Sequence, residues 1–167
     1  MSLEVMIPQF STPQDAADIV PSSVPLEDLG DIDETSSRFL GRDAAADYWI
    51  ARSGTSRLCF ISHIRTEGMS ASSCADITTF YRHGIGLSAG SGIRDPETSA
   101  EAYLFPADIV LPTAAHENRE SIMRAEVSSS TSNLVSVNPE SPGLAQFDVS
   151  RADGSVFQFA PAREVSE

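Results

Sequence analysis

The sequence predicts a domain of the α+β class, in which an antiparallel sheet carries two short helices and one intrachain disulfide. Short runs of β-branched and aromatic residues recur along the chain, with turn-forming residues between them. Helix-start signals occur at two places. The chain also contains two cysteines, an even number that permits one bridge.

Charge and hydrophobicity exclude several classes of function. The 167 residues include 24 acidic residues against 11 basic ones, which gives a net charge of −13, and every basic residue is an arginine. A nucleic-acid-binding protein needs a basic face to neutralise phosphates, so this class is excluded, as is docking on anionic lipid. The hydrophobic share of 41% suffices for the core of one domain. No run approaches the roughly 18 to 20 apolar residues of a membrane span.

The first part of the chain differs from the rest in charge. Residues 1–37 contain eight acidic residues and no basic ones, together with four prolines that disrupt helices and sheet ladders. Apolar residues are also present there, too many for a disordered linker. We therefore expect residues 1–35 to form an acidic, proline-rich arm that lies partly along a single domain of residues 36–163.

The first strands are expected at residues 47–52 and 57–65, because both runs are rich in aromatic and β-branched residues. A turn-like segment, residues 53–56, separates them. The run 69–74 would pair back on the second strand through a four-residue loop, residues 65–68. These segments predict an antiparallel meander.

The register of this meander places Cys59 directly opposite Cys74 on one face of the sheet. One disulfide is therefore predicted, with a stabilisation of about 3 kcal/mol from closing the loop. Disulfides persist in oxidising compartments, so the bond would place the domain outside the cytoplasm. Two buried, reduced thiols remain an alternative. A zinc site with His63 and His83 is disfavoured, because the spacings match no structural zinc pattern.

Two helices are expected between the strands. Asp76 is a suitable N-cap, apolar residues follow at helical spacing over residues 77–83, and Gly84 suits the position after the helix. A second helix could begin at Pro112 and run to about residue 126.

Four later runs have the composition of strands: residues 100–105, 133–137, 146–151 and 156–159. The last two are joined through Asp153–Gly154, a dipeptide that favours a tight β-hairpin turn. The C-terminal part of the chain is therefore predicted to be mostly β-structure.

A resemblance is carried by residues 37–86. It rests on five short motifs: Arg38–Phe39–Leu40–Gly41, Tyr48–Trp49–Ile50–Ala51–Arg52, Leu58–Cys59–Phe60–Ile61, Ala71–Ser72–Ser73–Cys74 and Phe80–Tyr81–Arg82–His83–Gly84. These motifs resemble the extracytoplasmic domain of uncharacterised actinobacterial single-pass membrane proteins. The family pattern has leucine after its first cysteine, where this chain has Phe60.

The resemblance implies a topology and supplies no catalytic residue. It favours the disulfide between Cys59 and Cys74, and it implies a membrane anchor upstream of Met1. The arm agrees with this topology independently, because a segment without basic residues suits the translocated side of a membrane span.

Residues 86–90 match the G-x-S-x-G pattern of a serine nucleophile, with Ser88 at its centre. Asp108 and His116 follow in the order found in α/β-hydrolases, so a small envelope serine hydrolase is one alternative function. The pattern requires a helix immediately after the serine, whereas Gly90, Gly92 and Pro96 follow here. A glycine-flanked strand is the preferred interpretation.

Other patterns support no cofactor and no metal. Residues 84–89 fit a dinucleotide-binding fingerprint but follow a predicted helix and do not open one. His116 and Glu120 lack the second histidine of a zinc protease, and the acidic residues 28–34 lack the ligand spacing of a calcium loop.

Trp49 and Tyr81 are weak candidates for a ligand-binding face, which gives a small-ligand-binding domain as a second alternative. The preferred expectation is a noncatalytic module on the extracytoplasmic side of the membrane, with an interaction, sensing or structural role at the cell envelope. Its partner would be an envelope protein or ligand whose identity the residues do not reveal.

Overall fold

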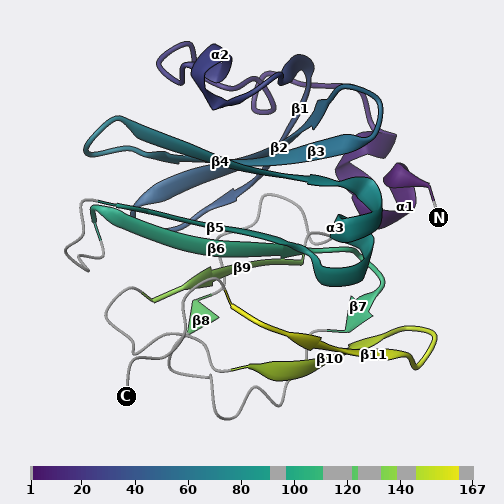
Figure 1. Cartoon of the computed structure of the whole chain (residues 1–167). Coiled ribbons are helices and arrows are strands. Elements are labelled where there is room, and N and C mark those ends of the chain that lie inside the picture. Colours follow the sequence, from purple (N-terminus) through teal and green to yellow (C-terminus); the bar gives the residue numbers. More distant parts are fainter. Residues whose placement is uncertain (1, 91–96, 111–121, 124–132, 139–145, 162–167) are drawn as a thin grey trace.

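A computed structural model of the chain describes residues 2–90, 97–110, 122–123, 133–138 and 146–161. Three antiparallel sheets are stacked in layers, and the N-terminal arm covers the outer face of the first sheet (Figure 1). None of the helices within these ranges has the length and hydrophobicity needed to cross a membrane.

The first sheet is a four-stranded meander. It comprises β1 (Asp33–Arg42), β2 (Ala46–Ser53), β3 (Arg57–Ile64) and β4 (Met69–Asp76), in that order. The predicted meander and its register are confirmed, because Ile64 pairs with Met69 and Cys59 pairs with Cys74. Strand β1 was not among the predicted strands. Its sequence, DETSSRFLGR, is mostly polar and carries no simple alternation.

Helix α3 (Ile77–His83) leads from the first sheet to the second, as predicted. The Asp76 carboxylate accepts a hydrogen bond from the Thr79 backbone N–H at 2.9 Å, which caps the first turn. Gly84 ends the helix with a φ of 71°, a conformation that favours glycine. A Cβ at this position would also lie 2.8 Å from the Leu104 carbonyl oxygen.

The second sheet contains β5 (Ile85–Gly90), β6 (Ser99–Phe105), β9 (Asn133–Val137) and β8 (Ile122–Met123), in that order. The strand predictions for residues 100–105 and 133–137 are confirmed. The helix predicted over residues 112–126 is wrong at β8, where Ile122 and Met123 pair with Val137 and Ser136. Pairing with a distant strand outweighs a weak local helix signal. The rest of that predicted helix lies outside the described residues.

The third sheet contains β11 (Val156–Phe159), β10 (Phe147–Arg151) and β7 (Ile109–Val110), in that order. The predicted hairpin of β10 and β11 is confirmed, with Ser150 paired to Val156 and Gly154 at a φ of 84° in the turn.

Hydrophobic clusters fill the spaces between the layers. Tyr48, Phe60 and Phe80 belong to the core cluster between the first and second sheets, together with Leu104 and Leu134 of the second sheet. A second cluster, which lies between the second and third sheets, contains Tyr103, Phe105, Val135, Val149 and Phe159. Both faces of β6, a central strand of the second sheet, are therefore buried. The fold is a small, mostly β structure with a few short helices, so the α+β class holds loosely.

The arm contains α1 (Leu3–Met6), the 3₁₀ turn η1 (Pro8–Ser11) and α2 (Leu26–Leu29). Met6, Ile7 and Phe10 reach into the core between the first two sheets. The buried Arg38 side chain holds this part of the arm, because it donates to the backbone carbonyls of Gln9 and Thr12, each at 3.0 Å. The arm therefore packs along the first sheet, and its last residues form the start of β1.

Candidate functional site

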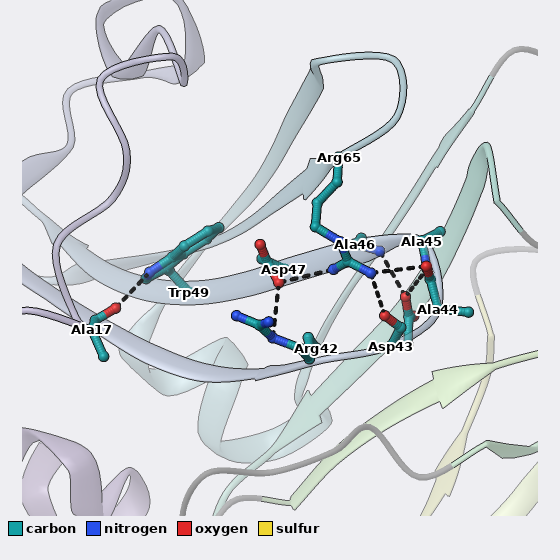
Figure 2. Close-up of polar contacts among 9 residues, drawn as sticks. All are labelled: Ala17, Arg42, Asp43, Ala44, Ala45, Ala46, Asp47, Trp49 and Arg65. Atoms are coloured by element: carbon teal, nitrogen blue, oxygen red, sulfur yellow. Dashed lines mark hydrogen bonds and ion pairs between the residues drawn. The ribbon is translucent and has the colours of Figure 1, made fainter.

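The outer face of the first sheet carries the features most relevant to function. Its central part is hydrophobic and lies beneath the arm, where Trp49 and Ile61 contact a cluster that includes Val20 and Val24. The indole N–H of Trp49 points to the Ala17 carbonyl at 3.4 Å (Figure 2). Only 3% of Trp49 is exposed. The arm therefore covers the residue that the sequence made a candidate for ligand binding.

The disulfide lies on this same outer face. Cys59 and Cys74 are bonded, with their Cα atoms 4.1 Å apart, as the register predicted. Cys59 is fully buried, and a Cβ placed on Gly30 of the arm would lie 3.9 Å from the Cys74 sulfur. The Ser72 hydroxyl next to it donates to the Leu29 carbonyl at 2.6 Å. The arm therefore packs directly over the disulfide.

A row of polar residues crosses the four strands at one end of this face. Arg42 of β1, Asp47 of β2, His63 of β3 and Ser70 of β4 are neighbours in register. Arg42 Nε lies 3.3 Å from an Asp47 carboxylate oxygen, and its side chain is 54% exposed. His63 Nδ1 lies 2.9 Å from the Ser70 hydroxyl. We call these four residues the polar row.

Arg65 fixes the hairpin turn at the end of the polar row. Its guanidinium donates to the Asp47 carboxylate at 2.9 Å and to the carbonyls of Asp43 and Ala44 at 2.7 and 2.8 Å (Figure 2). The Asp43 carboxylate accepts in turn from the Tyr48 hydroxyl at 2.6 Å. Burial, followed by the Asp43 charge, raises the pKa of Tyr48, so the phenol stays protonated.

Ser70 and His63 of the polar row form a pair, but Asp47 does not orient His63 as the third member of a catalytic triad would. A serine nucleophile needs a base that is itself oriented by a third group, and it needs donors for the oxyanion. Asp47 lies opposite His63 but directs its carboxylate to Arg42 and Arg65. This arrangement favours recognition of polar groups over nucleophilic chemistry. The predicted register of β3 and β4 already implies the pair of His63 and Ser70, but the complete row was missed because β1, which carries Arg42, was not predicted.

The residues of the hydrolase pattern lie in other surroundings. Ser88 is exposed in the middle of β5 and pairs in register with Glu101 of β6. Asp108 forms an ion pair with Arg151 at 2.6 Å. His116 lies outside the described residues. Packing accounts for the first glycine of the pattern, because a Cβ on Gly86 would overlap the Tyr103 ring.

The two aromatic ligand candidates belong to separate parts of the molecule. Trp49 lies beneath the arm, whereas Tyr81 of α3 packs against the core between the first two sheets. The Arg151 guanidinium lies over the Tyr81 ring, 3.9 Å from its centre, and also donates to the Tyr81 carbonyl. Tyr81 thereby joins α3 to the third sheet.

Within the described ranges, no group of three or more histidine, cysteine, aspartate or glutamate side chains is placed to hold a metal ion. Comparison of the chain with protein-family models, curated proteins and solved structures found no match.

Proposed function

We propose that this chain is a noncatalytic interaction module of a membrane-anchored protein, and that it works on the extracytoplasmic side at the cell envelope. The observation that carries the proposal is the Cys59–Cys74 disulfide. Such bonds persist in oxidising compartments and are reduced in the cytosol. The bond therefore indicates a non-reducing environment.

The disulfide is built into the packing of the domain. It ties β4, which lies at an edge of the first sheet, to the central strand β3, and the arm packs over it. Loss of the bond would release the edge strand together with the contacts between the arm and Ser72 and Cys74. A domain built in this way is most stable in an environment where the disulfide stays oxidised.

Anchoring and recognition rest on further features. The arm carries no basic residue within residues 1–37, which suits a segment next to a membrane on its translocated side. The resemblance of residues 37–86 to anchored extracytoplasmic domains supports the same topology. The partly exposed polar row, in which the Arg42 side chain is 54% exposed although it pairs with Asp47, supports contact with a polar envelope partner.

Topology is tested on the natural protein in the cells that make it. We expect a membrane-impermeant carboxylate-directed reagent to label this domain in intact cells, because the chain is rich in Asp and Glu and contains no lysine. We also expect non-reducing mass spectrometry to find Cys59 and Cys74 joined. Labelling that appears only after lysis, or free thiols in the protein taken from cells, would refute the proposed location.

The noncatalytic part of the proposal is tested with a panel of chromogenic esters. We expect no turnover above the buffer rate by the full chain. Turnover that is lost in Ser88→Ala or in Ser70→Ala would instead establish a hydrolase and name its nucleophile.

A further inference from the structure

The two edges of the first sheet differ in how they are protected. The backbone of β1 is covered by arm side chains: Gln14 donates to the carbonyls of Glu34 and Ser37 at 3.0 and 3.2 Å, and Asp18 accepts from the Phe39 N–H at 2.8 Å. The register of β1 is also interrupted by two irregularities. Bulges and covering segments are the usual means of blocking an edge strand.

Strand β4, at the other edge, differs in two respects: its register is regular, and in the described part of the chain the arm contacts its side chains and forms no hydrogen bond with its backbone. All eight of its residues pair with β3 without a register shift, and its sequence, MSASSCAD, contains no proline and no basic residue. In the described part of the chain, no segment other than β3 is paired with it. Strand β5, the edge of the second sheet, runs beside β4 and contains no charged residue (Figure 1).

The geometry identifies the backbone groups that β4 turns outward. The Cα separation of 4.1 Å between Cys59 and Cys74 is typical of an antiparallel pair that does not exchange hydrogen bonds. The N–H and C=O groups of Cys74 therefore face away from β3. Because the pattern alternates, those of Ser72 and Ser70 face outward as well.

The segment of the arm that contacts β4 is acidic. The arm touches β4 at Ser72 and next to Cys74 through Leu29 and Gly30. The exposed carboxylates of Glu27, Asp28 and Asp31 lie within two residues of these contacts, and no ion pair is formed by them with another described residue. A strand added to β4 would run beside this negative charge.

We propose that the β4 edge binds an extended, lysine- or arginine-bearing segment of a partner protein, which adds to the first sheet as a fifth strand. This inference rests on the proposed interaction function and names the partner's chemistry. A second copy of the chain fits less well, because each copy carries a charge of −13 and would bring its own α2 carboxylates to the edge.

The test uses two synthetic ten-residue peptides with the full chain. In one, lysine alternates with threonine or valine; in the other, glutamate replaces each lysine. We expect saturable binding of the lysine peptide by fluorescence anisotropy at low salt, and slower hydrogen exchange at the amides of Ser70, Ser72 and Cys74. We expect at least tenfold weaker binding of the glutamate peptide.

The variant Ser72→Pro removes one outward N–H, and Ser72→Ala is its matched control, because both lose the hydroxyl contact to Leu29. We expect Ser72→Pro to bind the lysine peptide at least tenfold more weakly and Ser72→Ala to bind within about twofold of the parent. If Ser72→Pro has a lower melting temperature than the parent, the double variant Glu27→Lys with Asp28→Lys provides a second test. It should shift the preference toward the glutamate peptide.

Three outcomes would overturn the inference: absence of lysine-peptide binding, equal binding by Ser72→Pro and Ser72→Ala, or protection of the β4 amides that rises with protein concentration alone. The last outcome would assign the edge to a second copy. The location is tested separately, by labelling of intact cells. The proposed strand addition at β4 can therefore be refuted while the proposed location stands.

Discussion

Cys59 of β3 and Cys74 of β4 are directly opposed residues whose Cα atoms lie 4.1 Å apart and whose sulfurs are bonded beneath the arm. This bond joins a central strand to an edge strand, and the N-terminal arm packs over it. Its position links the folding of the domain to the redox state of its surroundings.

Removal of the disulfide should destabilise the domain without preventing its folding. The bond closes a loop with a sequence separation of 15 residues, so the double variant Cys59→Ala with Cys74→Ala should lose about 3 kcal/mol of unfolding free energy. Urea unfolding measures the loss. Dithiothreitol should lower the stability of the parent and leave the double variant unchanged; a reductant effect on both would contradict this.

Docking of the arm should depend on the buried contact between Val24 and the cluster around Trp49. The substitution Val24→Asp places an unpaired charge there and should cost at least about 2 kcal/mol. Because the chain has one tryptophan, its emission reports directly on arm release and should move to longer wavelength. Val5→Asp, at a residue that is 55% exposed, is the control and should leave the spectrum unchanged.

The ion pair between Arg151 and Asp108 should contribute far more than the pair between Arg42 and Asp47. Arg151 is almost completely buried, so Arg151→Met leaves Asp108 without its cation and should cost about 3 to 5 kcal/mol. Arg42 is largely exposed, so Arg42→Met should cost less than about 1 kcal/mol. Chemical denaturation of both variants makes the comparison, and equal losses would argue against the buried contact.

Stability at acidic pH should depend on the cap of α3. The hydrogen bonds from Thr79 hold the pKa of Asp76 below its ordinary value of 3.8. A lowered folded-state pKa means that the stabilisation is present above the unfolded value and is lost as the pH falls through the folded value. Thermal melts of Asp76→Ala and the parent should therefore differ at pH 6 and converge as the pH falls through the lowered pKa of Asp76. A difference that persists in acid would contradict the assignment.

Gly86 should matter for packing, whereas Ser88 should not. A methyl group at position 86 would overlap the Tyr103 ring, so Gly86→Ala should lose about 1 to 3 kcal/mol. Ser88 is exposed on the same strand, and Ser88→Ala should stay within about 0.5 kcal/mol of the parent. Melting temperatures of the two variants measure the packing role of Gly86, and equal losses in both would contradict it.

Much of the local structure follows from short-range signals. The register that pairs Cys59 with Cys74, the cap of α3 at Asp76 and the hairpin around Gly154 depend on residues close together in the chain. For these elements, loop length, capping geometry and turn chemistry leave few alternatives.

The elements that the prediction missed depend on distant partners. Strand β1 is polar in sequence, yet Arg38 is buried because carbonyls of the arm accept its hydrogen bonds. Strand β8 exists through its pairing with β9. No short-range signal marks either strand, since each is held by groups far away along the chain.

Composition and neighbouring residues suffice to predict the acidic arm, the meander, the disulfide and the α3 helix. Tertiary contacts are needed to place the arm over Trp49, to bring Arg42 of β1 into one row with Ser70, and to cover the backbone of β1 while β4 keeps an unpaired edge. These relationships depend on the pairing of β1 and on the packing of the arm, and such long-range burial and pairing outweigh local propensity.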